Sequence, residues 1–261
     1  MHISNKTSHG LRSVALAAAF LACAVPATVA FAGGSSWGIG ERVQGNGVIK
    51  KQERQIGHFT GVAMGVPGNA ELHIGNKEGV SIESDENLLP LIETVVKDGV
   101  LEIRPSKRHL NLQSKSIHVV VWAREVNNLS LGGSGSLEAD AFKAPRVEVA
   151  LGGSGSINVK GIETRSLSLN LGGSGNMKIG GGSTDKLSIN IGGSGDVDAG
   201  MVKANDVSVT VGGSGQSTVW AKDELSFTVA GSGDVHYYGD PKINKTVLGS
   251  GGLKRLGSAP R

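Results

Sequence analysis

The aspartates Asp196 and Asp234 are the residues of this chain best suited to act as an acid and base pair. Each directly follows a Gly-Ser-Gly segment, and Gln216 follows the segment between them. If consecutive segments stack at the strand spacing of about 4.8 Å, the two carboxylates lie about 9.6 Å apart. Glycoside hydrolases hold their two carboxyl groups about 5 to 9.5 Å apart. The pair therefore defines one hypothesis, a polysaccharide-processing enzyme.

The equivalent positions after other segments favour a structural role for this pair. Ser136, Ser156 and Asn176 stand there, and aspartate is an ordinary residue at such turns. The histidines beyond the N-terminal segment show no paired spacing typical of metal ligands, and those at 73 and 118 are expected on solvated strand faces. We therefore predict a protein that is not an enzyme and uses no metal or cofactor. The histidines are His58, His73, His109, His118 and His236.

The seven serines inside the Gly-Ser-Gly segments form the second candidate site. The first five segments are 20 residues apart and the last two steps are 18 residues, which is too regular for a flexible linker. If each coil has one segment at the same corner, the hydroxyls form a ladder suited to an extended partner such as a glycan. The alternative is a small residue that satisfies backbone groups at a tight turn. The serines are Ser134, Ser154, Ser174, Ser194, Ser214, Ser232 and Ser250.

Alternating apolar residues on both sides of each segment indicate short β-strands. Leu167, Leu169 and Leu171 precede one segment, and Met177 and Ile179 follow it. A period of two places these residues on one buried face and polar residues on the other. A unit of about 20 residues cannot bury that face alone, so the units must stack. We predict an all-β parallel solenoid with glycines at the corners, because glycine enters positive φ freely.

Two other glycine-rich motifs do not fit these segments. Calcium-binding β-roll repeats need an aspartate at a fixed place in every nine residues, but Val197 stands at that place after Gly195. Phosphate-binding loops need a lysine directly after the glycines and then a helix. Neither feature is present, so the segments predict neither calcium nor nucleotide binding.

The N-terminal segment predicts export. Residues 1–32 contain Lys6 and Arg12, an apolar run and an Ala-Phe-Ala cleavage site before Gly33, which together are typical of a secretory signal peptide. The apolar run is shorter than the roughly 20 residues that a membrane span needs. The residues before Cys23 fit a lipoprotein signal poorly, so we expect a periplasmic, cell-surface or extracellular protein without a lipid anchor.

Charge and cysteine content exclude further classes. Removal of residues 1–32 takes away two of the 26 basic residues and none of the 23 acidic ones, which leaves a net charge of +1. That balance gives no support to a nucleic-acid partner. Cys23 is the only cysteine, so the exported chain would have no disulfide. Its stability must come from packing.

Residues 33–44 are interpreted as a flexible leader, residues 45–128 as an irregular β half and residues 129–255 as the repeat half of one domain, 45–261. Short alternating runs of the first half are separated by turn signals such as Pro67-Gly68-Asn69. Three parts of the chain resemble the auto-transporter adhesin head family, or GIN domain. They are the segment from Gln55 to Val62, the stretch "VSIESDENLLPLIETVVKDGVLEI" from Val80 to Ile103, and the Gly-Ser-Gly copies. The resemblance covers about residues 45–255.

This resemblance implies a right-handed parallel β-helix similar to pectin-lyase-like folds, in an exported bacterial protein with an adhesion role and no established catalytic residue. A lyase-like shape does not by itself indicate an enzyme. We therefore expect an exported β-solenoid that binds a glycan or another cell-surface component, as a monomer or a homo-oligomer. If the serine ladder is not the binding face, Trp122 and the basic run Lys107-Arg108-His109 are the next candidates.

Overall fold

The computed structural model describes residues 41–114 and 116–260, which belong to one compact unit, Ile39–Arg261. The predicted signal peptide and most of the predicted leader lie outside the described residues. In the described part, strands dominate, and the single helical element is a 3₁₀ turn, η1 (Leu89–Leu91). No helix in these ranges is long and apolar enough to cross a membrane.

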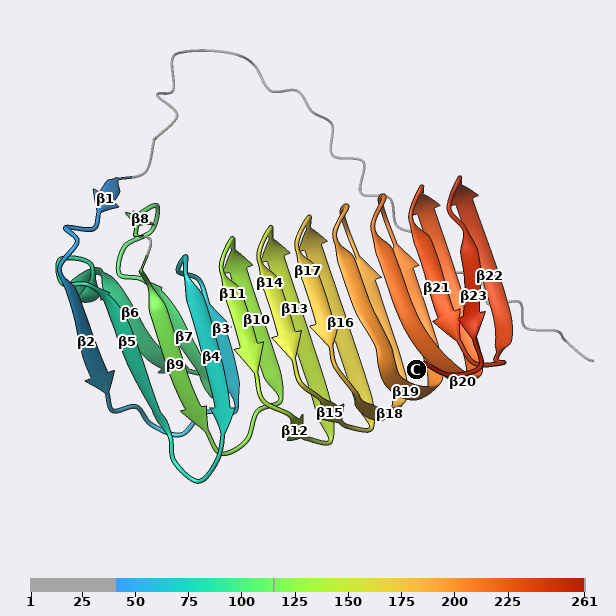
Figure 1. Cartoon of the computed structure of the whole chain (residues 1–261), viewed down its shortest axis with the longest axis horizontal. Coiled ribbons are helices and arrows are strands. Elements are labelled where there is room, and N and C mark those ends of the chain that lie inside the picture. The colour runs from blue at the N-terminus through green and yellow to red at the C-terminus, as the bar shows by residue number, and fades with distance from the viewer. Residues whose placement is uncertain (1–40, 115, 261) are drawn as a thin grey trace, which may run out of the picture. The chain divides into compact units, whose positions relative to one another are not determined.

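Parallel strands stack in chain order, one coil after the next (Figure 1). Each coil contributes a strand before the Gly-Ser-Gly corner and a strand after it. The strands before the corner are β3 (Gly61–Met64), β10 (Asn128–Gly133), β13 (Arg146–Gly153), β16 (Ser166–Gly173), the last parts of β18 (Gly182–Ile191), β19 (Asp196–Val211) and β20 (Gln216–Gly231), and β22 (Lys242–Gly249).

The strands after the corner form a second parallel row, and a short third row completes each coil. The second row consists of β4 (Asn69–Ile74), β11 (Ser136–Ala139), β14 (Ser156–Val159), β17 (Asn176–Ile179), the first parts of β19 and β20, β21 (Asp234–Tyr238) and β23 (Leu253–Gly257). The third row includes β12 (Phe142–Lys143), β15 (Ile162–Glu163) and the first part of β18. The predicted all-β solenoid with coils of about 20 residues is therefore confirmed.

The apolar positions of successive coils form continuous stacks in the interior. Val149, Leu169 and Ile189 are paired in register, and each is at most 1% exposed. Outward neighbours on the same strands are short polar residues such as Ser168 and Asn190. The alternation read from the sequence thus separates the core from the surface correctly.

The coil pattern also extends into the N-terminal half. Val62 of β3 pairs with Leu129, and Leu72 of β4 pairs with Ala139. Gly68 lies beside Gly135 at the corner, with Pro67 in the place that serine takes in later coils. Residues 61–74 are therefore a coil of the same solenoid without the serine. Below it, β7 (Val100–Pro105) pairs with β3, and β9 (His118–Ala123) pairs with β4.

Antiparallel strands cover the N-terminal end of the stack. β5 (Gly79–Asp85) pairs with β9 and with β2 (Ile49–Arg54), and β6 (Ile92–Lys97) pairs with β7. Leu88 beneath them is fully buried. β1 (Arg42–Gln44) pairs with β8 (Asn111–Gln113). The last residues of the predicted flexible leader are thus part of the fold, because their backbone finds partners in a distant segment.

Asp85 connects segments of this N-terminal cap through hydrogen bonds. It is 5% exposed, and its carboxylate accepts hydrogen bonds from the Ser114 hydroxyl at 2.5 Å and from the backbone N–H of Gly47 at 2.6 Å. These hydrogen bonds, the one from Ser114 foremost, hold the pKa of Asp85 below its ordinary value. The carboxylate therefore joins three separate segments of the cap while it is ionised.

We expect Asp85→Asn to remove a pH-dependent part of the stability. A carboxyl group whose folded pKa lies below its unfolded value of about 3.9 stabilises the fold above that pH, and this contribution is lost as the pH falls through the folded pKa. Thermal melts below about pH 4 should therefore show a steeper loss for the wild type than for Asp85→Asn. The same acid dependence in both proteins would show that Asp85 does not fasten the cap.

Candidate binding surfaces

The Gly-Ser-Gly corners stack as predicted, one per coil. The backbone N–H of Ser154 donates to the carbonyl of Gly133 at 3.0 Å, and that of Ser174 donates to Gly153 at 3.0 Å. The same bond recurs down to Ser250, whose N–H donates to Gly231 at 2.9 Å. All seven serines are exposed. Their hydroxyls form no hydrogen bond with another residue in ranges 41–114 and 116–260, so they remain available to a partner.

Close approach of the neighbouring coil requires both glycines of most corners, and positive φ is an added requirement only before the serine, which corrects the expectation that positive φ explains both. The glycine before the serine has positive φ in most coils, for example 124° at Gly153 and 137° at Gly173. Gly175, after the serine, does not have positive φ. A Cβ there would lie 2.3 Å from the carbonyl oxygen of Gly155. The second glycine is therefore required by the close approach of neighbouring coils.

The structure places Asp196 and Asp234 on either side of Gln216, two coils apart, as the sequence indicated. Each carboxylate is engaged by its neighbouring coil. Asp196 accepts a hydrogen bond from the backbone N–H of Gln216 at 3.0 Å, and Asp234 accepts one from Gly252 at 2.8 Å. Both bonds satisfy backbone N–H groups where a strand begins, which is the structural role that aspartate takes at turns.

A polar network that sequence reasoning missed crosses the outer face of the second row of strands. His73 contacts Glu71 at 3.2 Å and Asp140 at 3.1 Å, and His118 contacts Glu71 at 3.5 Å. Lys160 donates to Asp140 at 2.8 Å. This hydrogen bond is the main reason that the pKa of Asp140 lies below its ordinary value. The histidines face outward as expected, but they are paired with carboxylates rather than simply solvated.

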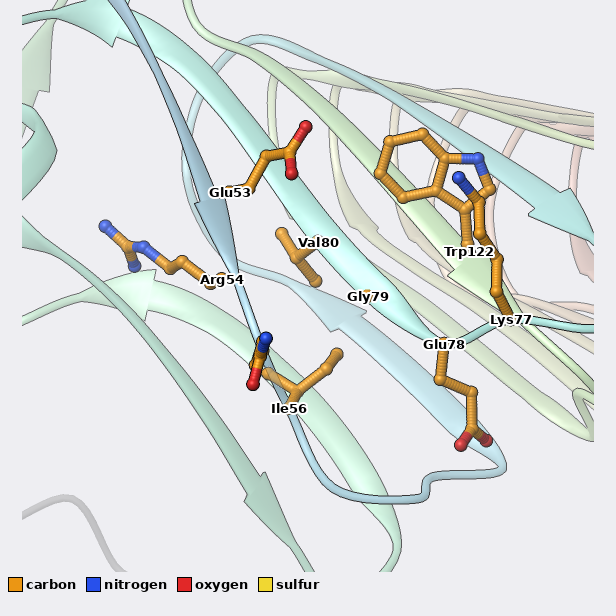
Figure 2. Close-up of a pocket in the computed structure, with 9 residues that line it drawn as sticks. Glu53, Arg54, Ile56, Lys77, Glu78, Gly79, Val80 and Trp122 are labelled. Carbon is orange, nitrogen blue, oxygen red and sulfur yellow. The ribbon is translucent and has the colours of Figure 1, made fainter.

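Beside this network lies a hollow of about 490 Å³ around Trp122 (Figure 2). The indole is half-buried and lies opposite Gly79 of β5, which has no side chain to cover it. Glu53 and Gln55 line one side, and Lys77 extends over the indole with its ammonium 4.1 Å from the ring centre. The predicted alternative Lys107-Arg108-His109 is an exposed turn after β7, with His109 at a positive φ of 62°.

The described residues contain no group of three or more side chains arranged to hold a metal ion. The exposed surfaces that could bind a partner are thus a row of hydroxyls, a charged network and an aromatic hollow. Residues 58–241 match the family described as "Putative auto-transporter adhesin, head GIN domain". The chain belongs to this family.

Solved structures resemble this GIN domain over most of its length. A putative adhesin from Bacteroides fragilis NCTC 9343 is 22% identical and aligns over 82% of this chain and 100% of its own, with a TM-score of 0.73. A putative lipid binding protein from Parabacteroides distasonis ATCC 8503 is 25% identical over 83% of this chain and 100% of its own, with a TM-score of 0.66. A putative adhesin from Parabacteroides merdae ATCC 43184 is 20% identical over 83% and 99%, with a TM-score of 0.62. No functionally curated protein matches this chain.

Membership of this adhesin family fits a binding role without catalysis. The geometry agrees with that role, because Asp196 and Asp234 are both bonded to backbone N–H groups. The serine ladder and the polar network are open rows on the outside of the solenoid.

Proposed function

We propose that this GIN domain is an exported, non-catalytic adhesion head that attaches to an extended glycan or another cell-envelope component. The observation that carries the proposal is the ladder of seven exposed serines: the backbone N–H groups of all but Ser134 donate to the preceding coil, while the hydroxyls bond to no described residue. Membership of an adhesin family supports the same role. The predicted signal peptide supports export.

The shape of the ladder indicates how it would bind. Seven coils at about 4.8 Å give a strip on the order of 30 Å long, with flanking glycines that leave backbone groups accessible. Each hydroxyl contributes little alone, so attachment depends on several intact coils acting together. A partner that repeats along its length, such as a glycan, meets this requirement.

A second candidate function is a polysaccharide-processing enzyme that uses Asp196 and Asp234. Their positions two coils apart favour it. Their hydrogen bonds to Gln216 and Gly252 favour a structural role instead.

Filling the ladder should weaken attachment. We expect the triple variant Ser154→Gln, Ser174→Gln and Ser194→Gln to fold normally, because these side chains are exposed, and to lose at least tenfold in attachment of the purified protein to cell surfaces or glycan arrays. The matched control is Ser168→Gln, Ser188→Gln and Ser208→Gln on the outer face of the same region, which should attach like the wild type. Equal attachment by both folded triple variants would exclude the ladder as the binding face.

A further inference from the structure

The aromatic side chains that reach solvent are confined to one row of the solenoid surface. Among the described residues, Phe59, Phe142, Phe227 and Tyr237 are at most 8% exposed. The remaining aromatic residues of ranges 41–114 and 116–260 are half-buried and point outward: Trp122, Trp220 and Tyr238. Large aromatic rings on a polar surface are typical of binding sites, because they offer wide contact at low cost in side-chain entropy.

Strand register places these three rings along the second row of strands, in a line with one irregularity: directly after the pair Ala199 and Val219 the register shifts, so that Trp220 pairs with Lys203. Trp122 pairs with His73 of β4, and Trp220 pairs with Tyr238 of β21. Between β9 and β20 lie six strand steps, through β4, β11, β14, β17 and β19. At about 4.8 Å per step, the two tryptophans are about 29 Å apart along the stack. The line runs at the far end of these strands from the serine corners.

From Trp122 towards Trp220, the row first has polar side chains and then two glycines. His73, Asp140 and Lys160 follow Trp122, all joined in the network described above. The next two positions are Gly180 and Gly200. A Cβ at Gly180 would lie 2.8 Å from the carbonyl oxygen of Lys160, and one at Gly200 would lie 2.9 Å from Cγ2 of Thr218. Gly180 and Gly200 thus add no side chain of their own, but the Tyr238 ring reaches over Gly200, with Cε2 3.5 Å from a Cβ there, and the ammonium of Lys203 lies 5.7 Å from the Trp220 ring centre.

The charges around Trp122 are balanced. Figure 2 shows Glu53 directed towards the indole and Lys77 beside it. Neither side chain forms an ion pair with another described residue, whereas the nearby Glu78 is bound to His58 at 2.6 Å and Arg54 is bonded to the carbonyl of Ile92 at 2.7 Å. The hollow thus offers one free carboxylate, one free ammonium and the amide of Gln55 around an aromatic surface.

We propose that this row binds an uncharged polysaccharide laid along the stack of coils, with sugar rings on Trp122 at one end and on Trp220 and Tyr238 at the other. A pyranose ring presents C–H groups on its face and hydroxyls around its edge. The faces pack on the aromatic rings, and the hydroxyls bond to polar groups such as the amide of Gln55 and the carboxylate of Glu53. A negatively charged chain would be attracted by Lys77 but repelled by Glu53, and a positively charged chain the reverse. Charge complementarity therefore favours a neutral chain.

Lys77 gives the proposal a specific consequence. Its ammonium lies over the Trp122 ring and must move to the edge of the hollow before a sugar can stack there. Removing an exposed cation–π contact is worth about a two- to fivefold change in affinity. Lys77→Ala should therefore bind a neutral glycan as well as the wild type, or up to about fivefold more tightly.

The proposal rests on the proposed adhesion function and is tested separately from it by titration of the full chain with neutral hexasaccharides: cellohexaose, laminarihexaose and mannohexaose. Hexagalacturonate serves as the acidic comparison, and tryptophan fluorescence and calorimetry provide the readouts. We expect at least one neutral probe to bind the wild type. Trp122→Ala and Trp220→Ala should each lose about tenfold in affinity, while circular dichroism stays native. Thr228→Ala on the other row of strands is the control and should bind normally.

Two results would overturn the aromatic row as a glycan site. One is binding of no neutral probe, or of hexagalacturonate alone, by the wild type. The other is unchanged binding by both tryptophan variants, and since they lie at opposite ends of the row, one misfolded variant leaves the second to decide. If either result occurs while the wild type still attaches to cell surfaces, the adhesion function stands without this site. If the wild type attaches to no surface, the adhesion function itself is wrong.

Discussion

Leu169→Asp is expected to prevent the central coils from folding. The Leu169 side chain is fully buried between Val149 and Ile189 of the adjacent coils. An aspartate there has no partner for its charge, which costs several kcal/mol, and the stability of a whole domain is about 5 to 15 kcal/mol. Each coil is stabilised by its neighbours on both sides, so the damage extends beyond one coil. Circular dichroism and thermal melting of the purified variant measure the effect.

The matched control is Ser188→Asp in the neighbouring coil. Ser188 points outward between Ser168 and Ser208, so the same charge reaches water and should change stability by about 0.5 kcal/mol or less. A soluble Leu169→Asp protein with wild-type melting would mean that the alternating apolar residues do not form the core.

Gly175→Val should strongly destabilise a serine corner. The new Cβ would lie 2.3 Å from the carbonyl oxygen of Gly155 and 2.8 Å from Cδ2 of Leu151. The carbonyl belongs to the backbone of the preceding coil and cannot move without breaking its bond to the N–H of Asn176, now 3.0 Å long. We expect a loss of about 3 kcal/mol or more, measured as free energy of unfolding in urea.

Two changes at the same corner separate this mechanism from others. Gly172→Val has open space, because no atom lies within 4 Å of a Cβ at that position, so it should be tolerated. Ser174→Ala removes a hydroxyl that no described residue binds and should cost about 1 kcal/mol or less. If Ser174→Ala were the more destabilising of the two corner changes at 174 and 175, the hydroxyl ladder rather than the glycine would hold the coils together.

The coil architecture could be predicted because its information is local and repeated. The triplet Leu167, Leu169, Leu171 fixes which face is buried, and the spacing of the Gly-Ser-Gly segments fixes the register between coils. The coil 61–74 was missed because Pro67 replaces the serine, although Gly65 and Gly68 keep the glycine positions. The antiparallel cap was not predictable, because the alternation of residues within β2 or within β5 does not indicate which other strand each of them pairs with.

The candidate sites depend on contacts between distant residues, which the sequence does not show. The positions of Asp196 and Asp234 followed from the repeat, but their bonds to backbone N–H groups depend on side-chain conformation. His73 and Asp140 are 67 residues apart, and no spacing rule joins them. Trp122 was a candidate from its type alone. Its place in the same row as Trp220 became visible only through six strand pairings, the last of which has a register shift just before Trp220.

We propose that this GIN domain binds an extended partner and does not cleave it. The most direct test incubates the purified protein with a panel of polysaccharides and measures, in the same samples, the retained protein and the release of new reducing ends. We expect saturable retention on at least one polysaccharide with no release above the buffer blank. Release of reducing ends by the wild type that Asp196→Asn abolishes would contradict it and establish the enzyme instead.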